Sequence, residues 1–274
     1  MALTDQAFMQ YSRQILLPEV GEHGQSRLSQ SHVLIVGVGG LGNLAAQYLA
    51  AAGVGRISLI DGDRIERSNL PRQLLFTSDD LGGNKADVAA QKLMRAYRDC
   101  HIHCYQHYLT ADSAATVFNN RYHAIDLVLD CSDNFAARQL VNQLAIEHKV
   151  TLVSASAAHF QGQLLSVNQQ ISPDTGCYHC LYPSDMSVSQ TCQTVGVLGP
   201  MVGSLASMQA LMSLNLLLTH DATAELPPIA VQSRCMDSRQ LLGQLYRFDG
   251  AKFTWRQATL ARDPDCTVCR VHER

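Results

Sequence analysis

The sequence has no excess of basic residues: 21 Lys and Arg stand against 24 Asp and Glu, for a formal net charge of -3 over 274 residues. Nucleic acids and acidic membrane surfaces attract proteins with a basic excess, so neither is expected as the main partner. Only 16% of the residues are charged, whereas 46% are hydrophobic. This composition excludes a disordered chain and provides enough apolar side chains for one large core.

The chain also lacks an apolar run at its start, since residues 1–14 include Asp5 among polar neighbours. No signal peptide is therefore predicted, and the expected location is the cytoplasm. Residues 187–220 contain no Asp, Glu, Lys or Arg, a stretch long enough to cross a bilayer. Its many Ser, Thr, Gln and Asn residues favour instead a loop followed by a helix over 202–218, buried in a soluble core.

The first half of the sequence alternates short β-branched runs with helical stretches. Strands are predicted over 32–36, 56–60, 101–105, 126–130 and 151–155, and helices over 43–52, 84–96, 112–119 and 135–148. Such alternation is typical of the α/β class and predicts a Rossmann-like doubly wound, mainly parallel sheet. After residue 155 the pattern changes to short strands, such as 163–168 and a strand-like tail over 246–255. We expect one continuous domain over 1–274, with a nucleotide-binding core over 1–155 and an extension over 156–274.

A glycine-rich turn follows the first predicted strand. Gly37, Gly39 and Gly42 match the G-x-G-x-x-G pattern between a strand and a helix. Backbone N–H groups and the helix N-terminus of such a turn can approach a phosphate without a Cβ in the way. Asp61 ends the second strand, where its carboxylate can accept hydrogen bonds from ribose hydroxyls. These features predict a nucleotide site, with a tight turn that binds nothing as the alternative.

Cations near the predicted phosphates indicate the kind of reaction. Arg72 and Lys85 follow the turn, and Asn69 can orient a phosphate oxygen. Hydride transfer does not require such cations, whereas displacement at a phosphate develops charge on the phosphoryl oxygens. Asp130 and Asp133 close another strand at the same sheet edge, where two carboxylates can hold Mg²⁺. Alternatively, Asp133 caps the helix that follows.

Four of the nine cysteines form two C-x-x-C pairs, Cys177 with Cys180 and Cys266 with Cys269. Four thiolates are the ligand set of a tetrahedral structural Zn²⁺. The long gap between the pairs suits a clamp that ties the C-terminal extension to the middle of the chain. A thioredoxin-like redox pair is the alternative, but neither pair lies at the strand-to-helix turn typical of that function.

Several motifs in order resemble the ThiF/MoeB/HesA family, bacterial relatives of the ubiquitin-activating enzymes. They are Tyr11-Ser-Arg13-Gln14, Gly37-x-Gly-Gly-Leu-Gly42, Asp61-x-Asp63, Ser68-Asn-Leu-x-Arg-Gln73, Lys85, Asp130-x-x-Asp133-Asn134 and the paired C-x-x-C. The resemblance covers nearly the whole chain. It implies that the C-terminal carboxylate of a small ubiquitin-fold protein attacks the α-phosphate of ATP, giving an acyl-adenylate and pyrophosphate.

Within the family, residues 8–17, 74–77 and 196–200 resemble the branch that adenylates ThiS, the sulfur carrier of thiamine biosynthesis. The alternatives are MoeB-type adenylation of the molybdopterin carrier, an NAD(P)-dependent dehydrogenase, and a nucleotide-binding protein without catalytic activity. A hydride-transfer acid or base is not evident beside the turn, which disfavours the dehydrogenase. The intact set of phosphate-contacting residues disfavours the non-catalytic protein.

The resemblance also implies roles for individual residues. Together with the glycine-rich turn, it assigns the ATP site to Gly40, Asp61, Asp63, Asn69, Arg72, Gln73, Lys85, Asp133 and Asn134. Asp133 would serve Mg²⁺ and catalysis, and Arg13 would act as an arginine finger on the ATP of the partner subunit in a homodimer. Pro71 departs from the family pattern, in which Gln is usual, and this leaves the shape of its loop open.

Cys192 stands in a polar loop without a C-x-x-C partner. An exposed thiol of this kind can attack an acyl-adenylate or a persulfide. The resemblance implies an acyl-disulfide link between Cys192 and the carrier, formed while a persulfide donor supplies sulfur. The alternative is an incidental loop cysteine. In the family reading, the extension over 156–274 binds the carrier and is clamped by zinc.

Overall fold

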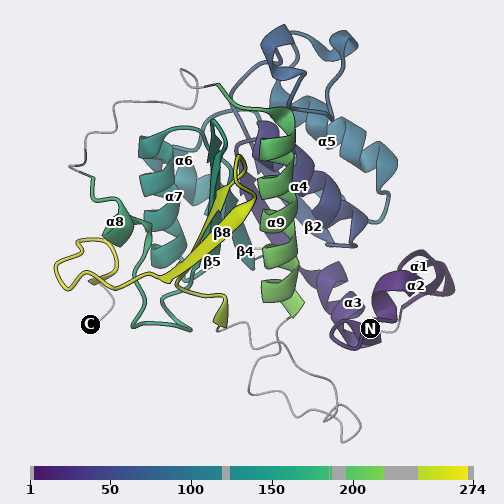
Figure 1. Ribbon diagram of the computed structural model, residues 1–274. Coiled ribbons are helices and arrows are strands. Elements are labelled where there is room, and N and C mark those ends of the chain that lie inside the picture. Colours follow the sequence, from purple (N-terminus) through teal and green to yellow (C-terminus); the bar gives the residue numbers. More distant parts are fainter. Residues whose placement is uncertain (1–2, 119–123, 185, 187–195, 219–239, 271–274) are drawn as a thin grey trace, which may run out of the picture.

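A single eight-stranded sheet runs through the computed structural model, which describes residues 3–118, 124–184, 186, 196–218 and 240–270 (Figure 1). Its spatial order is β3-β2-β1-β4-β5-β6-β7-β8. The strands are β1 His32–Val36, β2 Arg56–Ile60, β3 His101–Tyr105, β4 Leu127–Asp130, β5 Thr151–Ala158, β6 Gln161–Val167, β7 Gln244–Asp249 and β8 Thr254–Thr259. Strands β3, β2, β1, β4 and β5 pair in parallel, and the remaining pairs are antiparallel. The predicted mainly parallel α/β sheet is thereby confirmed.

Helices cover both faces of the parallel part. In chain order, the α-helices of the described residues are α1 Asp5–Gln10, α2 Ser12–Ile15, α3 Gly21–Gln30, α4 Gly40–Ala51, α5 Lys85–Ala96, α6 Ala111–Phe118, α7 Phe135–Glu147, α8 Tyr178–Leu181 and α9 Gly199–Leu218. Of these, α1 and α2 bury no residue. Helices α4, α5 and α9 share one core with Val33 and Ile35 of β1, and α6 and α7 share the other with Leu34 and Val36. Because both faces of β1 are covered, its sequence is continuously apolar rather than alternating.

Helix α9 is the long apolar helix predicted from the uncharged stretch. It is long and apolar enough to cross a bilayer, but half of its most apolar window is buried inside the protein. Gln209, on its buried side, donates to the carbonyl oxygens of Asp130 at 3.1 Å and Val153 at 2.9 Å. These bonds join the middle of α9 to the end of β4 and to the interior of β5, as expected for a core helix.

Two features differ from the sequence prediction. The tail predicted as one strand over 246–255 is a hairpin, in which β7 and β8 pair in antiparallel fashion around a turn. The turn forms because Asp249 Oδ1 accepts hydrogen bonds from the backbone N–H groups of Ala251 and Lys252. In addition, α4 begins at Gly40, inside the glycine-rich turn, rather than at residue 43.

The register between β1 and its two neighbours brings the predicted nucleotide-site residues to one edge of the sheet. Val36 pairs with Ile60 on one side and with Asp130 on the other, so the carboxyl ends of β1, β2 and β4 lie side by side. The glycine-rich turn, Asp61 and the loop after Asp130 therefore emerge at the same edge. This is the edge at which open α/β sheets bind ligands.

Candidate functional site

A cavity of about 460 Å³ opens at the carboxyl edge of β1, β2 and β4. Its volume falls within the range of about 300–1,000 Å³ typical of ligand sites. Of the predicted nucleotide-site residues, it is lined by Gly37, Gly39, Gly40, Asp61, Asp63, Arg72, Gln73, Lys85, Asp133 and Asn134. Asn69 and Gly42 do not line it. The structure thus brings together residues that are spread over nearly one hundred positions of the sequence.

The glycine-rich turn forms one wall of the cavity. Gly37 has a φ of 91°, and a Cβ at this position would lie 2.8 Å from the carbonyl oxygen of Cys131. Gly39 is the N-cap of α4 and provides no side chain to cap the helix. The first N–H groups of α4 therefore face the cavity with the positive end of the helix dipole, as suits an anion. Gly42 has a packing role here, because its Cβ would overlap the carbonyl oxygen of Gly37 at 1.9 Å.

Asp61 braces the turn from the end of β2. Its two carboxylate oxygens accept hydrogen bonds from the backbone N–H groups of Val38 at 2.7 Å and Asp63 at 2.8 Å. Burial raises the pKa of Asp61, and these two bonds offset only part of that effect. Each carboxylate oxygen has a second lone pair. Asp61 can therefore hold the turn and still accept a hydrogen bond from a ribose hydroxyl.

Lys85 provides a buried cation at the start of α5. Its Nζ lies 2.7 Å from Asp63 Oδ2, and only 8% of its side chain is exposed. The other oxygen of Asp63 accepts a hydrogen bond from the hydroxyl of Tyr108. Burial disfavours the charge on Asp63, but the bonds from Lys85 and Tyr108 outweigh it and lower the pKa of this carboxyl. The same hydrogen bond raises the pKa of Tyr108 to about 12.

Arg72 and Gln73 reach the cavity from the loop after β2. Arg72 Nη1 donates to the carbonyl oxygen of Ser68 at 2.9 Å, which folds its guanidinium back along the loop. Gln73 is 2% exposed, and its Oε1 has no hydrogen-bond partner among the described residues. A buried amide without a partner is costly, so a polar ligand beside Gln73 would stabilise it.

Asn69 stabilises this loop instead of lining the cavity. Its Oδ1 accepts a hydrogen bond from the backbone N–H of Glu66 at 3.1 Å, within a capping box around the short 3₁₀-helix Arg67–Asn69. The backbone N–H groups of Arg72 and Gln73 both bond to the carbonyl oxygen of Asn69. Pro71 fits this closed loop, and its carbonyl oxygen lies against Gly199 at the start of α9. The predicted contact between Asn69 and a phosphate therefore remains a prediction.

The loop after β4 separates its two acidic residues. Asp130 is 1% exposed, and its carboxylate accepts bonds from Ser132, Ser154 and Arg138. The expectation that Asp130 shares an ion with Asp133 is wrong for this arrangement, because Asp130 is directed into a buried network. Asp133 is exposed and lines the cavity.

The structure also identifies the residue that caps the N-terminus of α7. Asn134, and not Asp133, caps this helix, since Asn134 Oδ1 accepts from the backbone N–H of Ala137 at 2.8 Å. The alternative role for Asp133 as the helix cap is therefore wrong, and its carboxylate lies in the cavity wall without that constraint. In this position Asp133 is an oxygen ligand suited to Mg²⁺.

Arg13 is exposed on α2, away from this cavity. Its neighbour Gln14 donates to the carbonyl oxygen of Ala52, at the end of α4 opposite the glycine-rich turn. Helix α4 has 12 residues and is therefore about 18 Å long. Arg13 accordingly lies at the far end of α4 from the cavity of its own chain. Cys192 lies outside the described residues.

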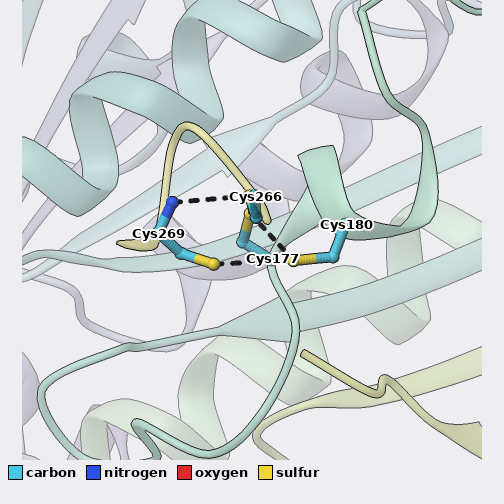
Figure 2. Close-up of side chains that lie close together, drawn as sticks. All are labelled: Cys177, Cys180, Cys266 and Cys269. Carbon is cyan, nitrogen blue, oxygen red and sulfur yellow. Dashed lines mark hydrogen bonds between the residues drawn. The ribbon is translucent and has the colours of Figure 1, made fainter. Parts of the chain in front are cut away.

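The four cysteines of the C-x-x-C pairs converge (Figure 2). All four Sγ atoms lie within 4.8 Å of one another, with separations of 3.8 Å for Cys177–Cys180 and Cys177–Cys266 and 3.5 Å for Cys180–Cys269. A tetrahedron with Zn–S bonds of about 2.3 Å has sulfur–sulfur edges of about 3.8 Å. The cluster could therefore hold a zinc ion, as predicted.

N–H groups around the cluster are placed to donate hydrogen bonds to cysteine thiolates. The backbone N–H of Asp263 donates to Cys180 Sγ at 3.5 Å, and that of Cys269 donates to Cys266 Sγ at 3.5 Å. Asn142 Nδ2 lies 3.6 Å from Cys177 Sγ. Such outer hydrogen bonds orient metal ligands and stabilise their negative charge. The cluster joins the C-terminal segment to α8, as expected of a clamp.

Sequence comparison identifies relatives over the full length of the fold. A model of the ThiF family matches residues 11–268. The chain is 38% identical over 267 residues to the Sulfur carrier protein ThiS adenylyltransferase of Escherichia coli K12, covering 97% of both chains. It is 37% identical over 270 residues to the Adenylyltransferase and sulfurtransferase MOCS3 of Drosophila yakuba. That match covers 97% of this chain but only 54% of the relative, so the chain spans about half of its length.

Solved structures share the fold. The crystal structure of E. coli MccB with MccA-N7isoASN superposes with a TM-score of 0.73 at 21% identity, over 96% of this chain and 74% of that one. The complex of E. coli MccB with ATP gives a TM-score of 0.70 at 22% identity, over 95% and 73% of the two chains. At these identities the likeness concerns the fold.

Proposed function

Because the chain belongs to the ThiF family, we propose that it is an adenylyltransferase that joins the C-terminal glycine carboxylate of a ThiS-like sulfur carrier to AMP. The relative with 38% identity aligns with 97% of both chains and bears this activity in its name. The observation that carries the proposal is the convergence of the glycine-rich turn, Arg72, Lys85 and Asp133 on one cavity. The adenylated carrier would then be converted to a thiocarboxylate for thiamine biosynthesis.

The reaction is a displacement at the α-phosphate of ATP. A carboxylate oxygen of the carrier forms a bond to the α-phosphorus, and the bond from that phosphorus to the bridging oxygen breaks. Pyrophosphate leaves with the electron pair, and the carrier retains AMP as an acyl-adenylate. Charge grows on the phosphoryl oxygens and on the leaving group, where Lys85, Arg72 and the N-terminus of α4 stabilise it.

Other cavity residues bind the substrate. Asp61 accepts a hydrogen bond from a ribose hydroxyl, and Gln73 gains a partner for its buried Oε1, which has none in the part of the chain that the structure describes. Asp133 would hold Mg²⁺, which when bound neutralises part of the triphosphate charge. Asn134 holds the Asp133 loop by capping α7.

Carrier-dependent exchange of labelled pyrophosphate into ATP tests the proposal. We expect exchange with a ThiS-type carrier ending in Gly-Gly and none with the same carrier lacking its last glycine. The MOCS3 relative of Drosophila yakuba, which matches 97% of this chain, supports a second candidate, adenylation of the molybdopterin carrier. Exchange with only that carrier would replace the thiamine assignment. Absence of exchange with either carrier, together with tight NAD binding, would contradict adenylation.

The sulfur-transfer step is assigned to Cys192. In this proposal a protein persulfide transfers its outer sulfur to the Cys192 thiol and is itself left as a thiol. The Cys192 persulfide then attacks the carbonyl carbon of the acyl-adenylate, AMP leaves, and an acyl-disulfide joins Cys192 to the carrier. Attack of the donor thiol on the Cys192 sulfur releases the carrier thiocarboxylate and leaves a disulfide between the two proteins. We expect Cys192→Ala to retain pyrophosphate exchange while lowering thiocarboxylate formation at least tenfold, as measured by mass spectrometry of the carrier. Cys104→Ala is the matched control. A collapse of exchange in a folded Cys192→Ala protein would contradict this role.

A further inference from the structure

The ion pair between Lys85 and Asp63 has a third member that the sequence motifs do not include. Tyr108 follows β3 in the loop that leads to α6, and its ring lies over Gly62. A Cβ on Gly62 would lie 2.9 Å from Tyr108 Cδ2 and Cε2. The phenol therefore reaches the rim of the cavity because residue 62 has no side chain.

Both oxygens of Asp63 are fixed, each by a different side chain. Oδ1 accepts from the Tyr108 hydroxyl, and Oδ2 lies 2.7 Å from Lys85 Nζ. A carboxylate held at only one oxygen can still rotate, whereas two partners set its plane. The ammonium of Lys85 ends a flexible four-carbon stem and has three N–H donors. With one donor directed to a fixed acceptor, the other two have defined directions.

We infer that Tyr108 is a positioning residue, which acts through Asp63 to hold the Lys85 ammonium where charge develops on the phosphates of ATP. The inference rests on the proposed adenylation. Tyr108 is 62% exposed, so its ring contributes little to the core, and we expect variants at this position to fold. Its hydroxyl is directed to Asp63, and the effect on catalysis is indirect.

Tyr108→Phe removes the hydroxyl and keeps the ring. In carrier-dependent exchange we expect kcat to fall about three- to tenfold, with the KM for ATP changed less than about twofold and the melting temperature unchanged. Tyr105→Phe is the matched control, because Tyr105 lies on β3 and does not line the cavity. We expect its kcat to equal that of the wild type.

A double-mutant cycle tests the route through Asp63. Once Asp63→Ala has removed the acceptor, Tyr108→Phe should lower kcat no further. Gly62→Ala provides a second variant, since its methyl group displaces the ring; its loss of kcat should not multiply with that of Tyr108→Phe. An equal loss with and without Asp63, a change in the KM for ATP alone, or an unchanged kcat in Tyr108→Phe would overturn the inference. Lack of exchange by the wild type would instead contradict the proposed function.

Discussion

Lys85 and Lys92 are two lysines of α5 that each pair with an aspartate, but only one of them faces the cavity. Lys85 pairs with Asp63 at the cavity, whereas Lys92 pairs with Asp80 and also donates to the carbonyl oxygen of Leu75 at 3.0 Å. The two residues therefore have similar chemistry at different places on one helix. Substituting each lysine in turn can therefore separate the catalytic role proposed for Lys85 from a purely structural role of such an ion pair.

We predict that Lys85→Gln lowers kcat for carrier-dependent exchange by about a hundredfold or more, because a preorganised cation is lost where charge develops. Lys92→Gln should change kcat less than about twofold. The measurement is pyrophosphate exchange under saturating carrier, with circular dichroism to verify folding. Equal losses in the two variants would show that the effect is structural and would contradict a catalytic Lys85.

A buried ion pair between Arg138 and Asp130 joins α7 to the end of β4. Arg138 Nη1 lies 3.2 Å from Asp130 Oδ2 and 2.9 Å from the carbonyl oxygen of Ala155, and Nη2 donates to the carbonyl oxygen of Ser132. Arg138 thereby ties the loop that includes Asp133 to the end of β4 and to the middle of β5. Removing one partner of a buried pair leaves an uncompensated charge.

Arg138→Met should lower the free energy of unfolding by about 3–5 kcal/mol, because the Asp130 carboxylate would remain buried without its cation. Adding Asp130→Asn should recover part of the loss, since the neutral side chain can still accept from Ser154. Arg95→Met, on an exposed part of α5, should stay within about 0.5 kcal/mol of the wild type. Urea denaturation measures all four proteins; a double variant less stable than Arg138→Met would contradict the burial argument.

The sequence predicted elements well where a buried strand lies between turns. The bounds of β1, β2 and β3 agree with the predicted 32–36, 56–60 and 101–105. The β7–β8 hairpin was taken for a single strand because every residue of β8 is exposed, so no apolar alternation marks it. Helices α1 to α3 are not predicted from the sequence, because α1 and α2 bury no residue and the buried residues of α3 include one large apolar side chain, Leu28.

Site residues are predictable where they lie directly at the end of a strand or the start of a helix. Gly37, Lys85 and Asp133 follow β1, start α5 and follow β4, and all three line the cavity. Tyr108 was missed because its bond to Asp63 joins residues 45 positions apart, and only the fold brings them together. The sequence does offer one indication of its role: Tyr108 follows β3, the parallel neighbour of β2, so it emerges at the same sheet edge as Asp61 and Asp63.

The cysteine cluster brings the C-terminal segment against α8, and we expect a bound zinc ion to hold it there. We predict that Cys266→Ser reduces bound zinc below half of the wild-type content and lowers the free energy of unfolding by about 2–4 kcal/mol. Closing a loop of roughly this length restricts the unfolded chain by an amount of that order. Elemental analysis and urea denaturation provide the measurements. Cys104→Ser, at a half-buried cysteine outside the cluster, should retain full metal content; gently purified wild-type protein without metal would contradict the clamp.

The position of Arg13 fits a role in catalysis only if two chains associate. It lies at the end of α4 opposite the cavity, so it cannot act on ATP bound in its own chain without a large rearrangement. A two-fold dimer applies the same contact in both directions, so each Arg13 could reach the cavity of the other chain. The exposed Phe8, Met9 and Leu16 beside it provide apolar surface for such a contact.

Mixing two inactive variants tests this arrangement. Arg13→Ala retains an intact cavity, and Lys85→Gln retains an intact arginine, so a dimer of the two has one complete site. If equal amounts of the two variants exchange subunits at random, half of the dimers contain one chain of each variant. Because each of these dimers has one complete site out of two, about a quarter of the wild-type pyrophosphate-exchange activity should return. The doubly substituted Arg13→Ala/Lys85→Gln protein mixed with Arg13→Ala should restore none. If Arg13 served its own chain, neither mixture would recover activity, because every cavity would lack either its lysine or its arginine.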